Sequence, residues 1–281
     1  MATVRAALAQ AAGKMHAAGV AEADREADWL LAHVLACSAG ALRLRGADVL
    51  GPDQESAFER LVQRRAAREP IQYILGTAEF LGLTLQVNPA VLIPRLDTET
   101  LVSEAAARLK GPVRVADIGT GSGAIAIGLA SLLPEARVVA IDISPDALAV
   151  ARTNAAATGC ADRIAFRQGD LVAPLAGEAF DAILSNPPYI GTHEWAGLMP
   201  EVREHEPQLA LTPGADALSF YRRLAVGAPP FLKPGGFLAV EVGETQAGAV
   251  QELFRQAGLA TAVCRDTAGI ERVVMGSRPA P

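Results

Sequence analysis

The chain has 281 residues, which is long enough for one large domain or for a large domain joined to a small one. Hydrophobic residues make up 51% and charged residues 20%, which excludes a disordered chain because enough apolar surface is available to offset chain entropy. The formal net charge of −6 disfavours sequence-independent nucleic-acid binding over the whole surface. A local basic groove is still compatible with this net charge.

The cysteines and the hydropathy of the sequence indicate the cellular compartment in which we expect the protein. Cys37, Cys160 and Cys264 are far apart and odd in number, so they indicate neither a disulfide framework nor a zinc knuckle. The N-terminus is alanine-rich without the apolar core of a secretion signal, and no stretch is long and apolar enough for a membrane span. We expect a cytoplasmic monomer with no metal site.

Residues 1–75 show helical periodicity. Val4, Leu8, Ala11 and Met15 share one helical face, and a second apolar stripe lies around residues 29–35. A third helix is predicted to begin at residues 52–53 and to end before Pro70, since proline disfavours a helical residue before it. The pattern predicts a small N-terminal α-helical bundle.

The composition changes at residue 76. Residues 76–95 alternate partly between apolar and polar side chains and contain turn residues, as in a β-hairpin linker. Residues 96–281 then repeat short apolar strands and helices, with two closing strands near residues 260–265 and 271–276. Strands that alternate with helices predict an α/β domain with a mostly parallel sheet covered on both faces.

A glycine-rich turn follows the first of these strands, in the sequence DIGTGSG at residues 117–123. Glycines at the start of a helix let the backbone approach a ligand, and its bare N–H groups face that ligand. Asp142 ends the next strand about twenty residues later, where a carboxylate can accept both ribose hydroxyl protons. Asp170 ends the third strand and could reach an adenine amino group.

This arrangement suits either a dinucleotide or S-adenosylmethionine. Asp117 precedes the glycine turn by two positions, a feature of methyltransferases rather than of dinucleotide enzymes. A carboxylate near the positive charges of S-adenosylmethionine is electrostatically favourable, so we favour that cofactor.

The sequence SNPPY at residues 185–189 follows another apolar strand and is the most specific signal in the chain. Pro187 and Pro188 lack N–H donors, which leaves carbonyl oxygens free to accept hydrogen bonds. Asn186 adds a side-chain carbonyl, and Tyr189 offers a flat face for a planar amide or base. Two acceptors aimed at an amide nitrogen raise its electron density and align it for methyl transfer.

These two turns, together with three further segments, resemble the release factor glutamine N5-methyltransferases. The segments are EPIQYILGTAEFLGL at residues 69–83, VLIPRLDTE at 91–99 and EPQLAL at 206–211, and the second turn matches as NPPYI at 186–190. The resemblance runs from about residue 20 to the C-terminus, and the combination is far more specific than any one motif. Leu96 stands where the family most often has proline, and Leu171 where it often has a larger aromatic residue.

The resemblance implies three domains: a helical substrate-docking domain at residues 1–75, a hairpin linker at 76–95, and a Rossmann-like class I methyltransferase domain with a seven-stranded sheet at 96–281. It implies S-adenosyl-L-methionine as cofactor, S-adenosyl-L-homocysteine as product, and class I peptide chain release factors as protein partners. The methyl acceptor would be N5 of the glutamine in their Gly-Gly-Gln loop. No nucleic acid would be bound.

The family's functional residues fall on matching positions of this chain. The implied cofactor contacts are Gly119, Thr120, Gly121, Ser122, Gly123, Asp142, Asp170, Leu171 and Asn186. The implied catalytic residues are Asn186, Pro187 and Tyr189, and Pro188 joins them in holding the substrate.

Two other functions remain open from the residues themselves. One is an adenine-N6 DNA or RNA methyltransferase, because the adenine amino group also needs two hydrogen-bond acceptors, which NPPY could provide. A non-catalytic S-adenosylmethionine-binding module is the second alternative, although every expected active-site residue is present.

Two groups of charged or titratable residues are not assigned to a site. The run of Arg64, Arg65 and Arg68 is predicted to be a solvated helix face that could also meet an acidic partner. His193, His205 and the glutamates between residues 194 and 206 match no standard metal spacing, so this segment is interpreted as a substrate-covering loop.

Overall fold

The computed structural model describes residues 2–280, so the outer limits of the predicted domains, Met1 and Pro281, lie outside the described residues. The chain forms two compact units. One, here called the helical unit, comprises Met1–Gly76 and the separate segment Met199–His205. The other, here called the sheet unit, comprises Thr77–Leu198 and Glu206–Pro281. The division into domains at residues 75 and 95 stays a prediction.

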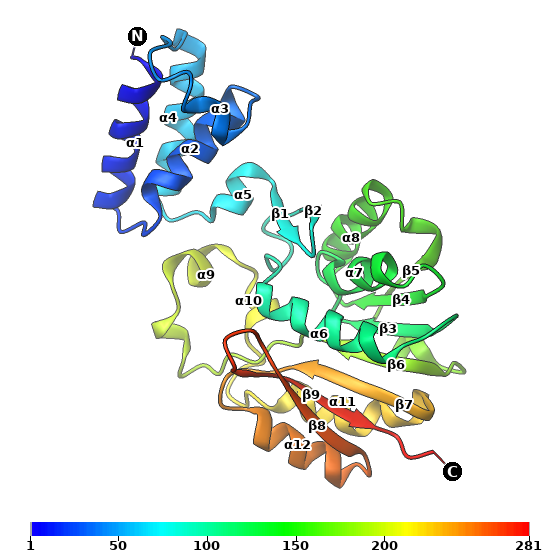
Figure 1. Cartoon of the computed structure of the whole chain (residues 1–281). Helices are drawn as coiled ribbons and strands as arrows, with labels where there is room; N and C mark the ends of the chain where they lie inside the picture. Colours follow the sequence, from blue (N-terminus) through cyan, green and yellow to red (C-terminus); the bar gives the residue numbers. More distant parts are fainter. Residues whose placement is uncertain (1, 281) are drawn as a thin grey trace. The chain divides into compact units, whose positions relative to one another are not determined.

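The helices of this unit are drawn in Figure 1. One apolar core is formed by residues 2–75 of the unit and contains no residue of the short separate segment Met199–His205. Small alanines such as Ala11 and Ala27 let neighbouring helices approach, and Met15, Leu30 and Leu31 fill the space between them. The helices are α1 (Val4–Ala17), α2 (Ala23–Val34), α3 (Ala39–Leu42), α4 (Pro52–Ala66), α5 (Ile71–Leu75) and α9 (Pro200–His205).

The prediction of a solvated arginine face is wrong for Arg65, on α4, and for Arg68, in the turn that follows α4. Arg65 is buried and its guanidinium donates to Glu26 Oε2 at 2.5 Å and to Glu201 Oε1 at 2.9 Å. Arg68 donates to both oxygens of Glu201, at 2.8 and 2.6 Å. Sequence periodicity could not reveal this, because Glu201 lies 136 residues after Arg65.

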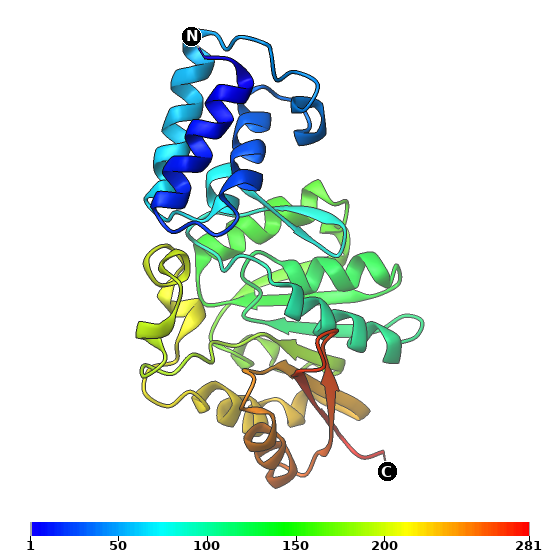
Figure 2. The same cartoon turned by 60° about the vertical axis from the view of Figure 1, so that its left-hand side comes forward.

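The sheet unit contains the predicted mostly parallel seven-stranded sheet, which is confirmed together with the N-terminal helical region (Figures 1 and 2). The strand order is β5-β4-β3-β6-β7-β9-β8, and only β9 pairs antiparallel with its two neighbours. The strands are β3 (Arg114–Ile118), β4 (Arg137–Asp142), β5 (Ile164–Gln168), β6 (Phe180–Ser185), β7 (Leu232–Glu241), β8 (Ala260–Arg265) and β9 (Glu271–Ser277).

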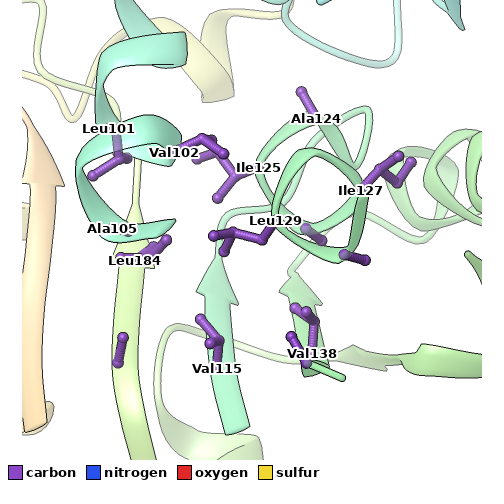
Figure 3. Close-up of a cluster of buried hydrophobic side chains, with 14 of the residues drawn as sticks. Leu101, Val102, Ala105, Val115, Ala124, Ile125, Ile127, Leu129, Val138 and Leu184 are labelled. Carbon is purple, nitrogen blue, oxygen red and sulfur yellow. The ribbon is translucent and has the colours of Figure 1, made fainter. Parts of the chain in front are cut away.

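Helices cover both faces of this sheet, as alternate strand residues require. Val115 of β3 points into one core with α6 (Leu96–Arg108) and α7 (Ala124–Leu132). Its neighbour Ala116 points into the opposite core, with α11 (Ser219–Gly227) and α12 (Ala247–Gln256). Figure 3 shows the first core, where Leu101 of α6 and Leu129 of α7 lie close to side chains of the strands.

The remaining elements of the sheet unit are short apart from α8 (Pro145–Ala157), which begins with the N-cap Ser144. The predicted hairpin consists of β1 (Thr77–Phe80) and β2 (Leu83–Gln86), paired antiparallel. The others are α10 (Gln208–Leu211) and 3-10 turns at Ala161–Arg163, Ala173–Leu175, Trp195–Gly197 and Pro229–Phe231.

No helix within residues 2–280 combines the length and apolarity needed to cross a lipid bilayer. The longest, α4, has 15 residues, whereas a membrane span needs about 20.

The buried ion pairs of the helical unit generate a stability prediction. Replacing Glu201 with alanine removes one of the two carboxylate partners of the buried Arg65 and the carboxylate partner of the half-buried Arg68, so we expect about 3 kcal/mol less stability in this unit. Hydrogen exchange of the α2 and α4 amides measures the change. Glu204→Ala is the control, because Glu204 forms an exposed pair with Arg203 that is worth under about 1 kcal/mol. Equal effects of the two substitutions would contradict the prediction.

Candidate active site

A cavity of about 300 Å³ lies in the sheet unit, where β3 and β6 end. The strand order changes direction here: from β3 the chain continues to β4 on one side, whereas β6 lies on the other side of β3. Such switch points form crevices at the carboxyl ends of parallel strands. Among the residues singled out in the sequence, the cavity is lined by Gly119, Thr120, Gly121, Ser122, Asp142, Asp170, Leu171, Asn186 and Pro188.

The glycine turn is held in place by the neighbouring strand. Backbone N–H groups of Gly119 and Thr120 donate to the carbonyl oxygen of Ile141 in β4, at 2.8 and 2.9 Å. Gly123 has a left-handed φ of 85° as the N-cap of α7. A Cβ on Gly123 would also lie 3.3 Å from the Cα of Ala151, so this position needs glycine for conformation and for space.

Asp142 joins the glycine turn to α8. Its Oδ2 accepts a hydrogen bond from Gly121 N, and its Oδ1 accepts one from Ser144 N, both at 2.9 Å. Each carboxylate oxygen keeps a free lone pair, so Asp142 can still accept hydroxyl protons from a ligand in the cavity.

Asp117, at the end of β3, is fully buried beneath the turn. Its Oδ2 accepts from Thr120 Oγ1 at 2.6 Å and from Ala126 N at 3.1 Å. Its Oδ1 is a buried side-chain polar atom without a hydrogen-bond partner among the described residues. Burial raises the pKa of Asp117 to about 7, because a charged carboxylate is poorly solvated there.

Asp170 and Leu171 mark the part of the cavity beyond β5. Asp170 Oδ2 accepts a hydrogen bond from Arg223 of α11 at 2.5 Å, a contact that the sequence did not indicate. Arg223 also lies over the ring of Phe220, which itself lines the cavity. An aromatic side chain therefore lines the same cavity as Leu171, at a position 49 residues further along the chain.

The NPPY turn is anchored at both ends. Asn186 Nδ2 donates to Thr98 Oγ1 at 3.1 Å. At the other end, Gln246 Nε2 donates to the carbonyl oxygen of Tyr189 at 2.9 Å, and Ile190 N donates to Leu211 O at 3.0 Å. These anchors leave the side-chain oxygen of Asn186 without a hydrogen-bond donor among residues 2–280.

A buried carboxyl group, Glu241 at the end of β7, lies behind this turn. It accepts hydrogen bonds from the hydroxyl groups of Thr98, at 2.5 Å, and Tyr189, at 3.3 Å. Burial raises the pKa of Glu241 to about 7. Burial and the adjacent Glu241 also raise the pKa of the Tyr189 phenol. No sequence signal singled out Glu241.

Three predicted site residues do not line the cavity: Gly123, Pro187 and Tyr189. Gly123 caps α7 and Pro187 is buried. The Tyr189 side chain packs against the core under α11 and α12. In this structure these three residues contribute to the shape of the two turns rather than to the cavity wall.

The family segments of the sequence meet around the cavity. Glu206, the first residue of EPQLAL, accepts hydrogen bonds from Arg95 and, at 3.1 Å, from Ile93 N. Glu99 accepts a hydrogen bond from Leu81 N at 2.7 Å, where Leu81 has a left-handed φ of 49°. The glutamate-rich segment thus divides: Glu206 supports the cavity wall, while Glu201 belongs to the helical unit.

Two family models match the chain. The PrmC N-terminal domain matches residues 6–76, and the methyltransferase small domain matches residues 94–200. Among solved structures, a methyltransferase from Pyrococcus furiosus has a TM-score of 0.54 at 19% identity, covering 71% of this chain and 90% of its own. That likeness concerns the fold.

Two curated relatives match over nearly the full length. The release factor glutamine methyltransferase of Geobacter sulfurreducens is 46% identical over 275 residues, covering 98% of this chain and 96% of its own. The release factor glutamine methyltransferase of Moorella thermoacetica is 45% identical over 280 residues, covering 98% and 99%. The chain therefore belongs to the release factor glutamine methyltransferase family.

Proposed function

We propose that this enzyme transfers a methyl group from S-adenosyl-L-methionine to N5 of the glutamine in the Gly-Gly-Gln loop of class I release factors. Full-length similarity to enzymes named for this substrate supports the proposal. One structural observation carries it: Asn186 and Pro188 line the same cavity as the glycine turn. Methyl donor and acceptor can therefore be held against each other.

The residues of the cavity fit S-adenosyl-L-methionine. We assign the methionine moiety to Gly119–Ser122, the ribose to Asp142, and the adenine to Asp170, Leu171 and the face of Phe220. The partnerless Oδ1 of Asp117 supports a cationic ligand, because a buried carboxylate without a donor favours nearby positive charge. When bound, this cofactor supplies an electrophilic methyl group on a sulfonium.

The NPPY turn would bind and orient the glutamine carboxamide. Asn186 Oδ1 and a proline carbonyl oxygen accept its two N–H protons, which increases electron density on a nitrogen whose lone pair is otherwise delocalised. The nitrogen loses its proton to solvent water as or after it is methylated, because the methylated nitrogen is strongly acidic, so no conventional strong base is needed. Pro187 and Tyr189 keep the turn rigid, and S-adenosyl-L-homocysteine is the second product.

The helical unit is assigned to docking of the release factor, as its match to the PrmC N-terminal domain suggests. The experiment that tests the whole proposal incubates the enzyme with labelled S-adenosyl-L-methionine and either a purified release factor or duplex DNA. Mass spectrometry then maps the label. Label on the Gly-Gly-Gln glutamine supports the proposal, whereas label on adenine, or none, contradicts it.

Removing the side-chain acceptor of the turn should abolish most of the activity. We expect Asn186→Ala to lower kcat by about 10²- to 10³-fold, because one preorganised hydrogen-bonding group is lost from the transition state. Steady-state kinetics with a release factor measures kcat, and calorimetry checks cofactor binding. Gln256→Ala, which alters an exposed amide on α12, is the control. Full activity of Asn186→Ala would disprove the acceptor role.

Removing the assigned ribose ligand should act on cofactor affinity. We expect Asp142→Ala to raise the cofactor Kd at least about tenfold, because it loses two charge-assisted hydrogen bonds to the ligand and the support of Gly121. Asp142→Asn keeps one acceptor oxygen and should fall between. Asp162→Ala, an exposed carboxylate near β5, is the control. An unchanged Kd in Asp142→Ala would reject the assignment.

Cofactor binding should release a proton near neutral pH. In the free protein the pKa of Asp117 is about 7, so its carboxyl group is about half protonated at pH 7. A bound cation lowers this pKa, so binding at pH 7 should release about half a proton per protein molecule. Because the free protein binds more protons than the complex, cofactor affinity should rise with pH through this range. Calorimetry in buffers of different ionisation enthalpy measures the release. Asp117→Asn should abolish it and Asp162→Asn should not; release that persists in Asp117→Asn refutes this origin.

A further inference from the structure

The buried carboxyl behind the NPPY turn is connected to the turn through one hydroxyl group. Strands β6 and β7 pair in parallel, with Ser185 opposite Val240, so the residues that follow, Asn186 and Glu241, come side by side. Thr98, in the first turn of α6, lies next to both. Glu241 is 1% exposed and Thr98 is 4% exposed.

The single hydroxyl proton of Thr98 determines the direction of the hydrogen bonds between Asn186, Thr98 and Glu241. A threonine hydroxyl has one proton, and Thr98 donates it to Glu241 Oε2. Thr98 can then only accept from Asn186, which places the Asn186 NH₂ group toward Thr98 at 3.1 Å. The Asn186 carbonyl oxygen is therefore the end of the amide that remains for a ligand.

The opposite orientation of this amide would work against methyl transfer. A flipped Asn186 would present N–H donors to the N–H donors of a glutamine carboxamide and would remove one of the two acceptors. In a buried site, a donor facing a donor is costly. A device that selects one orientation therefore contributes directly to substrate alignment.

We propose that Thr98 and Glu241 are positioning residues that fix the amide of Asn186 with its oxygen toward the substrate. This inference rests on the proposed function. Glu241 acts through Thr98, and the hydroxyl of Tyr189 holds the second carboxylate oxygen at 3.3 Å. The pair thus contacts both ends of the NPPY turn, and Thr98 lines the cavity whereas Glu241 does not.

The protonation of Glu241 determines how strictly the orientation is set. An ionised carboxylate can only accept, whereas a neutral one can also donate and would allow Thr98 to reverse. Burial and Asp97 raise the pKa of Glu241, while Thr98, Tyr189 and Arg272 lower it, and the result is about 7. Tyr221 of α11 donates to the backbone oxygen of Glu241. The positioning effect should therefore strengthen as pH rises through about 7.

Kinetics of substituted enzymes test the proposal. Thr98→Val removes the hydroxyl at nearly constant volume and should lower kcat about 10- to 100-fold, with the cofactor Kd and the release factor KM within about twofold of wild type. Thr98→Ser restores the hydroxyl and should recover most of kcat. Unchanged kcat in Thr98→Val, or equal loss in Thr98→Ser, would overturn the proposal.

The pH profile separates positioning from a merely structural role. Wild-type kcat should rise through about pH 7, and Glu241→Gln should lose this rise and fall below wild type at pH 8, because glutamine cannot ionise and can both donate and accept. Unchanged cofactor Kd in Glu241→Gln verifies that the sheet unit is folded. A rise that persists unaltered in Glu241→Gln contradicts the proposal.

A measurement without substrate distinguishes failure of this inference from failure of the proposed function. The ¹⁵N side-chain amide signals of Asn186 can be identified by their loss in Asn186→Ala. They should shift and exchange faster with solvent in Thr98→Val but not in Thr98→Ser. If wild type methylates no release factor, the proposed function fails; if these signals are unaffected by Thr98→Val, the positioning fails by itself.

Discussion

The parallel pairing of β3 with β6 is the constraint on which the site depends. Ile118 and Ser185 are register partners at the ends of these strands, although 67 residues separate them in the chain. The strands run in the same direction, so the turns that follow them emerge at one edge. Ser185 Oγ also donates to the carbonyl oxygen of Ile118 at 2.8 Å, which ties the two turns together where they begin. The glycine turn and the NPPY turn therefore share a cavity.

Two buried carboxyl groups support these turns in different ways. Asp117 lies under the glycine turn and Glu241 behind NPPY, and burial raises the pKa of each to about 7. Glu241 has hydroxyl donors on both oxygens, which suits a group that holds other side chains in place. Asp117 keeps one oxygen without a partner, which suits a group that responds to the charge of a ligand. The two carboxyl groups thus have similar pKa values but different hydrogen-bonding environments.

The segments that identify the family also have physical tasks in this structure. Arg95, Thr98 and Glu99 of VLIPRLDTE each bind a different partner: Glu206, Glu241 and the backbone of Leu81. Leu96, at the position where the resemblance implies a proline, is 79% exposed and makes none of these contacts.

Much of the fold and both turns followed from local chemistry. Glycine at left-handed φ, prolines without N–H groups and apolar residues at strand and helix spacing act within a few residues, so the sequence indicates them directly. Side-chain partners were harder to foresee. The same arginine spacing describes a solvated helix face and a buried ion-pair network, and only the arrival of Glu201 from a distant segment separates the two.

The sequence by itself determined the alternation of strands and helices after residue 96, the glycine turn, the acceptor-rich NPPY turn and the family, but not the helices α9, α10 and α11 between residues 200 and 227. The tertiary structure alone decided that Thr98 links Asn186 to Glu241, over separations of 88 and 143 residues, and that Arg223 engages Asp170. The physical reason is that conformational preferences are local, whereas burial and hydrogen-bond partners arise only when distant strands and helices pack. A glutamate becomes a positioning group only after its neighbours have excluded water.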